Sequence, residues 1–238
     1  MGEAQTTRGS ARTQRGVLAR PLDALLFLLP LILFYEIVAS GRPERIIAFD
    51  WMRHFLELFG RVSLWAPGFA VIIILLTTHA ASGEQWRVHW RELGFMYVEA
   101  VFLAMPLLVL NWLIPLAALS SSGGTLLEQL ALRVGAGIYE ELIFRLVLIS
   151  AVIIIGVDVL RIKQTPVAIA AIILSALAFA AHHHRPIGSE PFDAMTFTFR
   201  SLAGAYLATI FWYRGYGPAA GCHVAYNVAL LAVSGLRS

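Results

Sequence analysis

The sequence predicts an all-α, polytopic transmembrane helical bundle with about seven spanning helices and one interfacial helix. Hydrophobic residues make up 58% of its 238 residues and charged residues only 14%. Soluble domains are typically about 45–50% apolar and about 25% charged. The apolar residues also fall into separate runs of about 20 residues, the length that crosses a bilayer. We therefore expect an integral, multi-pass membrane protein.

The spanning helices are expected at seven apolar runs. They cover residues 22–39, 64–81, 95–119, 138–156, 166–184, 194–213 and 218–235. Residues 45–59 mix charged and aromatic side chains at helical spacing, which favours a helix lying in the membrane interface. Trp86 and Trp90 mark the loop before the third span as interfacial. Residues 125–137 are expected to form a short helical approach to the fourth span.

Three regions follow from the distribution of charge and hydropathy. Residues 1–20 are expected to be a disordered basic tail, residues 21–122 an N-terminal transmembrane extension with the interfacial helix, and residues 123–238 a transmembrane core. The tail carries four arginines against the single acid Glu3, so it should be attracted to anionic lipid. No nucleic-acid partner is expected. Cys222 is the only cysteine, which excludes an internal disulfide and a cysteine-based zinc site.

Ionisable side chains inside the predicted spans form clusters that need a partner or a function, because inserting each costs on the order of 2.5–3.5 kcal/mol. The first cluster is Glu140, Glu141 and Arg145, near the start of the fourth span. Arg145 lies one helical turn beyond Glu141 and can pair with it. Glu140 then points about 100° away around the helix and can face a cavity.

The other two clusters consist of histidines with an amide. His182, His183 and His184 end the fifth span, whereas His223 and Asn227 share one face of the seventh span at i and i+4. Counting crossings, we expect the start of span four, the end of span five and the start of span seven on one side of the membrane. The three clusters would then meet at similar depth.

Acyl transfer to water is the chemistry that such a site allows. Glu140, held away from water, could act as a general base toward a water molecule. A histidine could hold that water or protonate the leaving amine. His223 and Asn227 could donate hydrogen bonds to the oxyanion, a role often associated with about 10²–10³ in rate per donor.

Structural and metal-binding interpretations remain open beside the catalytic one. Glu140 and Glu141 could form ion pairs with Arg145 or with Arg200 in the sixth span, and His223 and Asn227 could be an interhelical hydrogen-bonded pair. Arg200 needs an acidic partner or a water-filled cavity in mid-span, so it is counted as a supporting residue. Zinc is the alternative cofactor, because Glu140, His183 and His223 form a His₂Glu set, although the HExxH signature is absent.

Three motifs occur in order: EExxxR, FxxxH and HxxxN. They are Glu140-Glu141 with Arg145, Phe179 with His183, and His223 with Asn227. Over about residues 125–235 this trio resembles the CAAX-protease and bacteriocin-processing (CPBP, or ABI) family of intramembrane glutamate endopeptidases. The resemblance implies a protease without a cofactor, in the inner membrane of a bacterium. Its expected partners are the lipid bilayer and a membrane-anchored or lipid-linked protein or peptide substrate.

The resemblance also implies a role for each motif residue. Glu140 is the water-activating base, Glu141 assists it and Arg145 braces the pair. His183 positions the water, His223 and Asn227 form the oxyanion hole, and Phe179 packs one turn below His183. His182 and His184 are expected to be interfacial residues without a chemical role.

Two other function classes are compatible with the same residues. A catalytically silent relative could act as a membrane binding or immunity partner, and a small transporter could use the same residues as a proton relay. The transporter predicts inverted repeats, which the sequence does not show. The membrane face of the site stays open: the arginine-rich N-terminus favours the outer face, whereas a crossing by residues 45–59 would favour the cytoplasmic face.

Overall fold

The computed structural model describes residues 20–41, 65–114, 124–188 and 190–235. The fold class is all-α as predicted, and the described residues contain no β-strand. They form long helical segments: α2 (Pro21–Gly41), α5 (Ala66–Ser82), α6 (Trp90–Leu113), a continuous run from Leu126 to Val159, α9 (Gln164–His183), α10 (Ala194–Arg214) and α11 (Tyr216–Gly235). The predicted interfacial helix at 45–59 and nearly all of the predicted basic tail lie outside the described residues.

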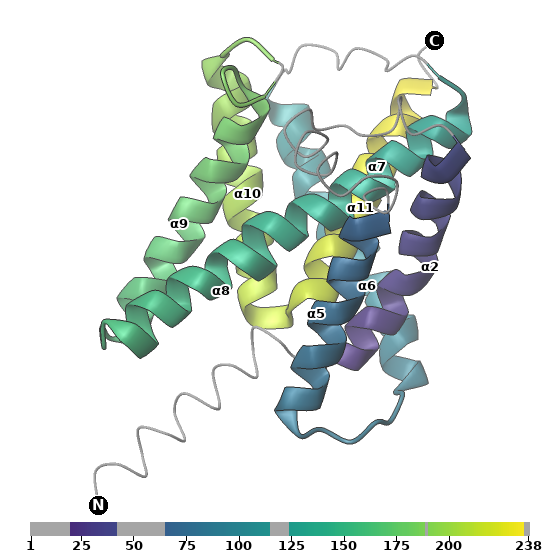
Figure 1. Cartoon of the computed structure of the whole chain (residues 1–238). Helices are drawn as coiled ribbons and strands as arrows, with labels where there is room; N and C mark the ends of the chain where they lie inside the picture. The colour runs from purple at the N-terminus through teal and green to yellow at the C-terminus, as the bar shows by residue number, and fades with distance from the viewer. Residues whose placement is uncertain (1–19, 42–64, 115–123, 189, 236–238) are drawn as a thin grey trace, which may run out of the picture.

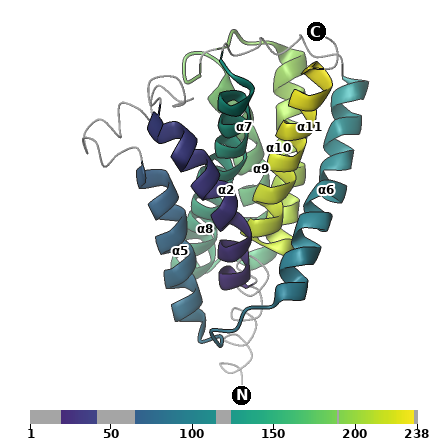
Figure 2. The same ribbon diagram turned by 90° about the vertical axis from the view of Figure 1, so that its right-hand side faces the viewer.

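Four of these segments are long and apolar enough to cross a membrane: α2 over Pro21–Ala39, α6, the run Leu126–Val159 and α9. They make the chain an integral membrane protein, although the predicted number of about seven spans is not established. α5 is apolar but shorter, and α10 and α11 are not among the four. α11 lies inside the bundle, in contact with α2, α6, α7 and α10 (Figure 2). A helix surrounded by protein does not need a continuous apolar surface.

The predicted approach helix and the predicted fourth span form one continuous helical segment. It comprises α7 (Leu126–Glu141), the π-helical turn η2 (Leu142–Val147), α8 (Leu148–Ile153) and a second π-helical turn, η3 (Ile154–Val159). Thr125 starts it with a capping box, accepting from the Glu128 N–H while the Glu128 carboxylate accepts from the Thr125 N–H. The run crosses the bundle diagonally (Figure 1).

A π-helical turn begins directly after the two glutamates. Its wider winding shows in the Leu148 N–H, which donates to the Ile143 carbonyl five residues earlier. The hydroxyl of Ser175 in α9 donates to the Phe144 carbonyl at 2.8 Å and so satisfies a backbone acceptor inside this turn. Single π-helical turns of this kind are often found at functional sites.

The chain direction of α11 differs from the expectation. α10 runs between α9 and α11, so α11 begins at the end of the bundle opposite to the one where α9 ends (Figure 1). The prediction that the start of span seven and the end of span five share one side is therefore wrong. His223 nevertheless approaches the other clusters, because it lies about two turns into α11. Glu140 lies about four turns into its own tilted helix.

Close approach of α7 and α11 depends on Gly137. A Cβ atom at this position would lie 2.8 Å from the backbone nitrogen of Val224, a separation that real Cβ atoms do not show. The glycine therefore brings the helix that carries Glu140 against the helix that carries His223.

Candidate active site

Glu140 lies between two histidines that come from different helices. Its Oε1 is 3.7 Å from His183 Nε2 at the end of α9, and its Oε2 is 3.7 Å from His223 Nε2 in α11. The Glu140 side chain is 6% exposed and that of His183 is 20% exposed, so the group is buried with a partial opening at His183. Both separations exceed a direct hydrogen bond, but each is short enough for one water to contact both partners.

Hydrogen bonds on the far side of each ring fix which nitrogen faces Glu140. His183 Nδ1 lies 2.9 Å from the Phe179 carbonyl oxygen, which can only accept, so Nδ1 carries the proton. His223 Nδ1 likewise donates to Glu141 Oε1 at 2.9 Å. Such a bond sets the tautomer and the orientation of an imidazole ring. Both histidines therefore present Nε2 to Glu140.

The predicted Glu141–Arg145 pair is present and completely buried. Arg145 Nη1 is 3.1 Å from Glu141 Oε1, and both side chains are 0% exposed. Arg145 also donates from Nη2 to the Gly204 carbonyl in α10 at 3.2 Å. Its guanidinium lies 4.5 Å from the centre of the Phe179 ring, a cation–π contact. Glu141 is thereby held where it can accept from His223.

The aromatic ring of Phe179 packs against both histidines of the cluster. Its ring centre lies 5.1 Å from that of His183, 5.8 Å from that of His223 and 5.7 Å from that of Phe144, all in edge-to-face geometry. The predicted contact with His183 is present. The ring also contacts the second histidine and Arg145, which the one-turn spacing along α9 did not predict.

Asn227 is directed to the backbone of α7 and not to Glu140. Its Nδ2 donates to the carbonyl of Arg133 at 3.2 Å. The amide nitrogen carries two hydrogens, so this bond leaves a second donor. The described contacts bring Glu140, Glu141, His183 and His223 together, whereas Asn227, one turn beyond His223 in α11, contacts α7 at Arg133.

Arg200 finds its acidic partner in a loop and not in the glutamate pair considered above. It donates to both carboxylate oxygens of Glu190, at 2.7 and 2.9 Å. The Glu190 backbone N–H in turn donates to the His183 carbonyl at 3.2 Å. Arg200 thus holds the α9–α10 loop against the end of the helix that carries His183.

His182 and His184, at the end of α9, are buried within the protein, at 6% and 3% exposed. The loop after α9 folds back over the helix end, and Arg185 N–H donates to the Glu190 carbonyl at 2.8 Å. His184 Nδ1 lies 3.1 Å from the Pro191 carbonyl, and the His182 ring packs on Phe144 at 5.4 Å. The loop thus packs around the His184 ring, whereas the His182 ring packs against the helix that carries Glu140.

Several residues that support the site carry no motif signal. The Tyr216 hydroxyl donates to the Ile138 carbonyl at 2.9 Å, and the Tyr139 hydroxyl donates to Glu36 at 2.8 Å. Of these residues, only Glu36 could have been identified from the sequence, as an acidic residue in an apolar span. It is 3% exposed and lies inside the bundle.

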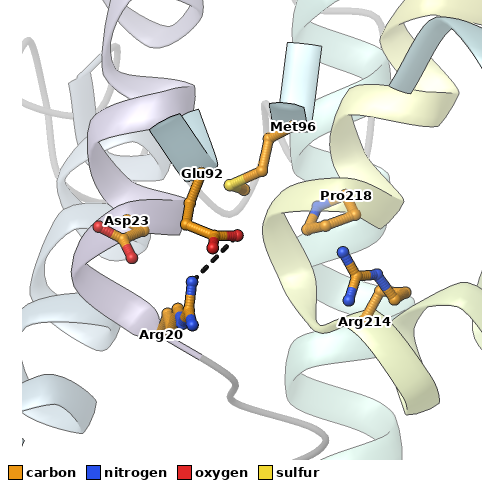
Figure 3. A pocket seen from close by; sticks show the side chains of 6 residues that line it. All are labelled: Arg20, Asp23, Glu92, Met96, Arg214 and Pro218. Atoms are coloured by element: carbon orange, nitrogen blue, oxygen red, sulfur yellow. Dashed lines mark ion pairs between the residues drawn. The ribbon is translucent and has the colours of Figure 1, made fainter. Parts of the chain in front are cut away.

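A cavity of about 190 Å³ lies apart from this cluster, at the end of the bundle where α2, α6 and α11 begin (Figure 3). It contains none of the predicted site residues. Arg20 and Glu92 form an ion pair of 3.1 Å on one side of it, and Arg214 lies on the other side beside Pro218.

Within the described ranges, no group of three histidine, cysteine, aspartate or glutamate side chains is arranged to hold a metal ion. Glu140 instead faces His183 and His223 through separate oxygens.

Comparison with known proteins agrees with the motifs. Residues 122–229 match the family described as type II CAAX prenyl endopeptidase Rce1-like. No curated protein and no solved structure matches the chain. The matched residues include Glu140, His183 and His223, together with the part of each helix that precedes them. Over these residues the chain is similar to the Rce1-like family, in agreement with the resemblance of its motifs to the CPBP family.

Proposed function

We propose that the protein is an intramembrane endopeptidase that uses Glu140 to activate water and hydrolyse a peptide bond in a membrane-anchored or lipid-linked protein. The observation that carries the proposal is the Glu140 carboxylate, buried between the Nε2 atoms of His183 and His223 at 3.7 Å each. Its setting is the membrane of a bacterial cell.

In the proposed reaction, Glu140 takes a proton from a water that His183 Nε2 orients by accepting its second hydrogen. The oxygen of that water forms a bond to the peptide carbonyl carbon, and the carbonyl electron pair moves onto its oxygen. The C–N bond then breaks as Glu140 returns the proton to the leaving amine. One water is consumed, and one carboxylic acid and one amine are released.

Two residues of α11, His223 and Asn227, would stabilise the oxyanion. His223 donates its Nδ1–H to Glu141, so it can donate from Nε2 only in its doubly protonated form, flanked by Glu140 and Glu141. Asn227 supplies a second donor by its remaining amide hydrogen. Such preorganised donors stabilise the transition state because they are already oriented when charge develops. The Glu141–Arg145 pair keeps His223 in place.

Burial of the site favours substrates that reach it through the membrane. The cluster lies among apolar helices, and His183 is its most exposed member. The family name further suggests a prenylated C-terminal Cys-aliphatic-aliphatic-X sequence as a narrower substrate. A donor–quencher peptide with such an end tests that narrower substrate.

The test compares membrane proteomes of host cells that carry the wild-type protein, Glu140→Gln or the control Glu84→Gln. Glu84 is exposed in the loop after α5, so its replacement should change nothing. We expect a defined set of membrane proteins to accumulate uncut only with Glu140→Gln. If the folded, expressed variant changes the length of no protein, the catalytic role fails and a membrane binding or immunity role takes its place.

A further inference from the structure

The helix that carries Glu140 is held on its other side by a buried carboxylate from outside the family match. Glu36 lies in α2 and is 3% exposed. Its Oε1 accepts a hydrogen bond of 2.8 Å from the hydroxyl of Tyr139, which is also 3% exposed and directly precedes Glu140. One hydrogen bond therefore joins α2 to α7 next to the proposed base.

The same carboxylate fixes a third helix. Glu36 accepts a hydrogen bond from the backbone N–H of Gly68, in the first turn of α5. The first N–H groups of a helix have no partner within that helix, and a carboxylate is a favourable acceptor for them. A side chain at Gly68 would collide with Glu36. Glu36 thus joins α2, α5 and α7 at one point.

The preceding residue of α2 packs on the same face of α7. The ring of Tyr35 occupies the space that a Cβ atom at Gly135 would need. Tyr35 and Tyr139 also pack edge to face, with ring centres 5.1 Å apart. Two adjacent residues of α2 therefore contact α7 one helical turn apart, which resists rotation of α7 about its axis.

We propose that Glu36 and Tyr139 are positioning residues that set the rotation of α7 and so aim Glu140 at the two histidines. The proposal rests on the proposed function, in which Glu140 is the base. Successive helical residues point about 100° apart, so holding Tyr139 toward α2 directs Glu140 toward α9 and α11. The π-helical turn begins only two residues after Glu140, where the winding of the helix changes and contacts from other helices must define its orientation.

Four single variants separate positioning from general stability. Tyr139→Phe removes only the hydroxyl, Glu36→Met removes the acceptor at similar length, and Glu36→Gln retains an acceptor oxygen. Tyr97→Phe is the matched control, since its hydroxyl donates to the Phe27 carbonyl at 3.0 Å and joins α6 to α2 away from Glu140. Thermal unfolding in detergent reports whether each variant is folded.

The activity assay follows a membrane protein that accumulates uncut with Glu140→Gln. Tyr139→Phe and Glu36→Met should each lower kcat by about tenfold with KM changed by less than about twofold. Their combination should lose no more than Glu36→Met alone, because Tyr139→Phe removes only the hydrogen bond that Glu36→Met has already removed. Glu36→Gln should retain most of kcat, and Tyr97→Phe all of it. Wild-type kcat in Tyr139→Phe, or an equal loss in Tyr97→Phe, would overturn the positioning role.

Hydrogen exchange gives a second measurement that needs no substrate. Tyr139→Phe should accelerate amide exchange in α7 and η2, whereas Tyr97→Phe should leave these segments unchanged. Unchanged exchange in α7 contradicts the proposal even if kcat falls. Failure of the proposed function has a different signature: Glu140→Gln then leaves every membrane protein at its usual length, while exchange in α7 still responds to Tyr139→Phe.

Discussion

Replacing Arg145 by Met should destabilise the protein much more than replacing Arg214 by Met, although Arg214 makes the shorter ion pair. Arg214 contacts Glu99 at 2.7 and 2.9 Å, with side chains 55% and 25% exposed. Arg145 lies 3.1 Å from Glu141, with both side chains at 0%. Comparing the two variants therefore tests whether contact distance or burial determines the loss of stability.

Burial should decide the magnitude of the loss. Removing one partner of a buried pair leaves an uncompensated charge and costs roughly 3–5 kcal/mol in the free energy of unfolding. Arg145→Met also removes the hydrogen bond to the Gly204 carbonyl and the cation–π contact with Phe179. An exposed pair such as Arg214–Glu99 is typically worth about 0.2–1 kcal/mol. The two losses should differ by at least about 2 kcal/mol.

Unfolding in mixed micelles, titrated with sodium dodecyl sulfate, measures these free energies. The single variant Glu141→Met and the double variant Arg145→Met with Glu141→Met complete a double-mutant cycle. The double variant removes both charges of the pair. Its loss of stability should therefore be smaller than the sum of the losses of Arg145→Met and Glu141→Met, by about 0.5–3 kcal/mol. A loss for Arg145→Met no greater than that for Arg214→Met, or strict additivity in the double variant, would refute the reasoning.

Three further predictions concern packing, the oxyanion and metal. Gly137→Ala should lower the free energy of unfolding by roughly 1–3 kcal/mol, because its Cβ would meet Val224. Gly94→Ala has open space around it and should be neutral or stabilising by up to about 1 kcal/mol. Thermal unfolding compares the two variants. Asn227→Leu should lower kcat by about 10²–10³ with little change in KM, and an unchanged kcat removes Asn227 from the oxyanion role. Dialysis against a zinc chelator should leave cleavage intact, while a loss that added zinc restores would favour the zinc alternative.

Local spacing predicted the parts of the site that lie within one helix. The Glu141–Arg145 pair followed from their i,i+4 separation, and the apolar runs predicted α2, α9, α10 and α11 to within a few residues at each end. These predictions succeeded because the geometry of a helix is the same wherever it is placed.

Contacts between helices were predicted less well. Arg200 was expected to need an acidic partner, but the partner is Glu190 in a loop whose fold depends on backbone bonds to His183 and Arg185. The same loop packs around the His184 ring. A run of polar residues after a span indicates a loop, but it does not indicate that the loop folds back over the helix end.

The hydroxyl contacts around α7 explain why motifs alone are insufficient to define the site. Tyr139 donates to Glu36 of α2, Tyr216 of α11 donates to the Ile138 carbonyl, and Ser175 of α9 donates to the Phe144 carbonyl. These bonds reach the helix from three directions around Glu140. Polar groups are costly inside a membrane unless they are paired, so such contacts restrict both the rotation and the winding of the helix. The motifs identify the groups proposed to react, whereas residues that no motif contains determine how those groups face one another.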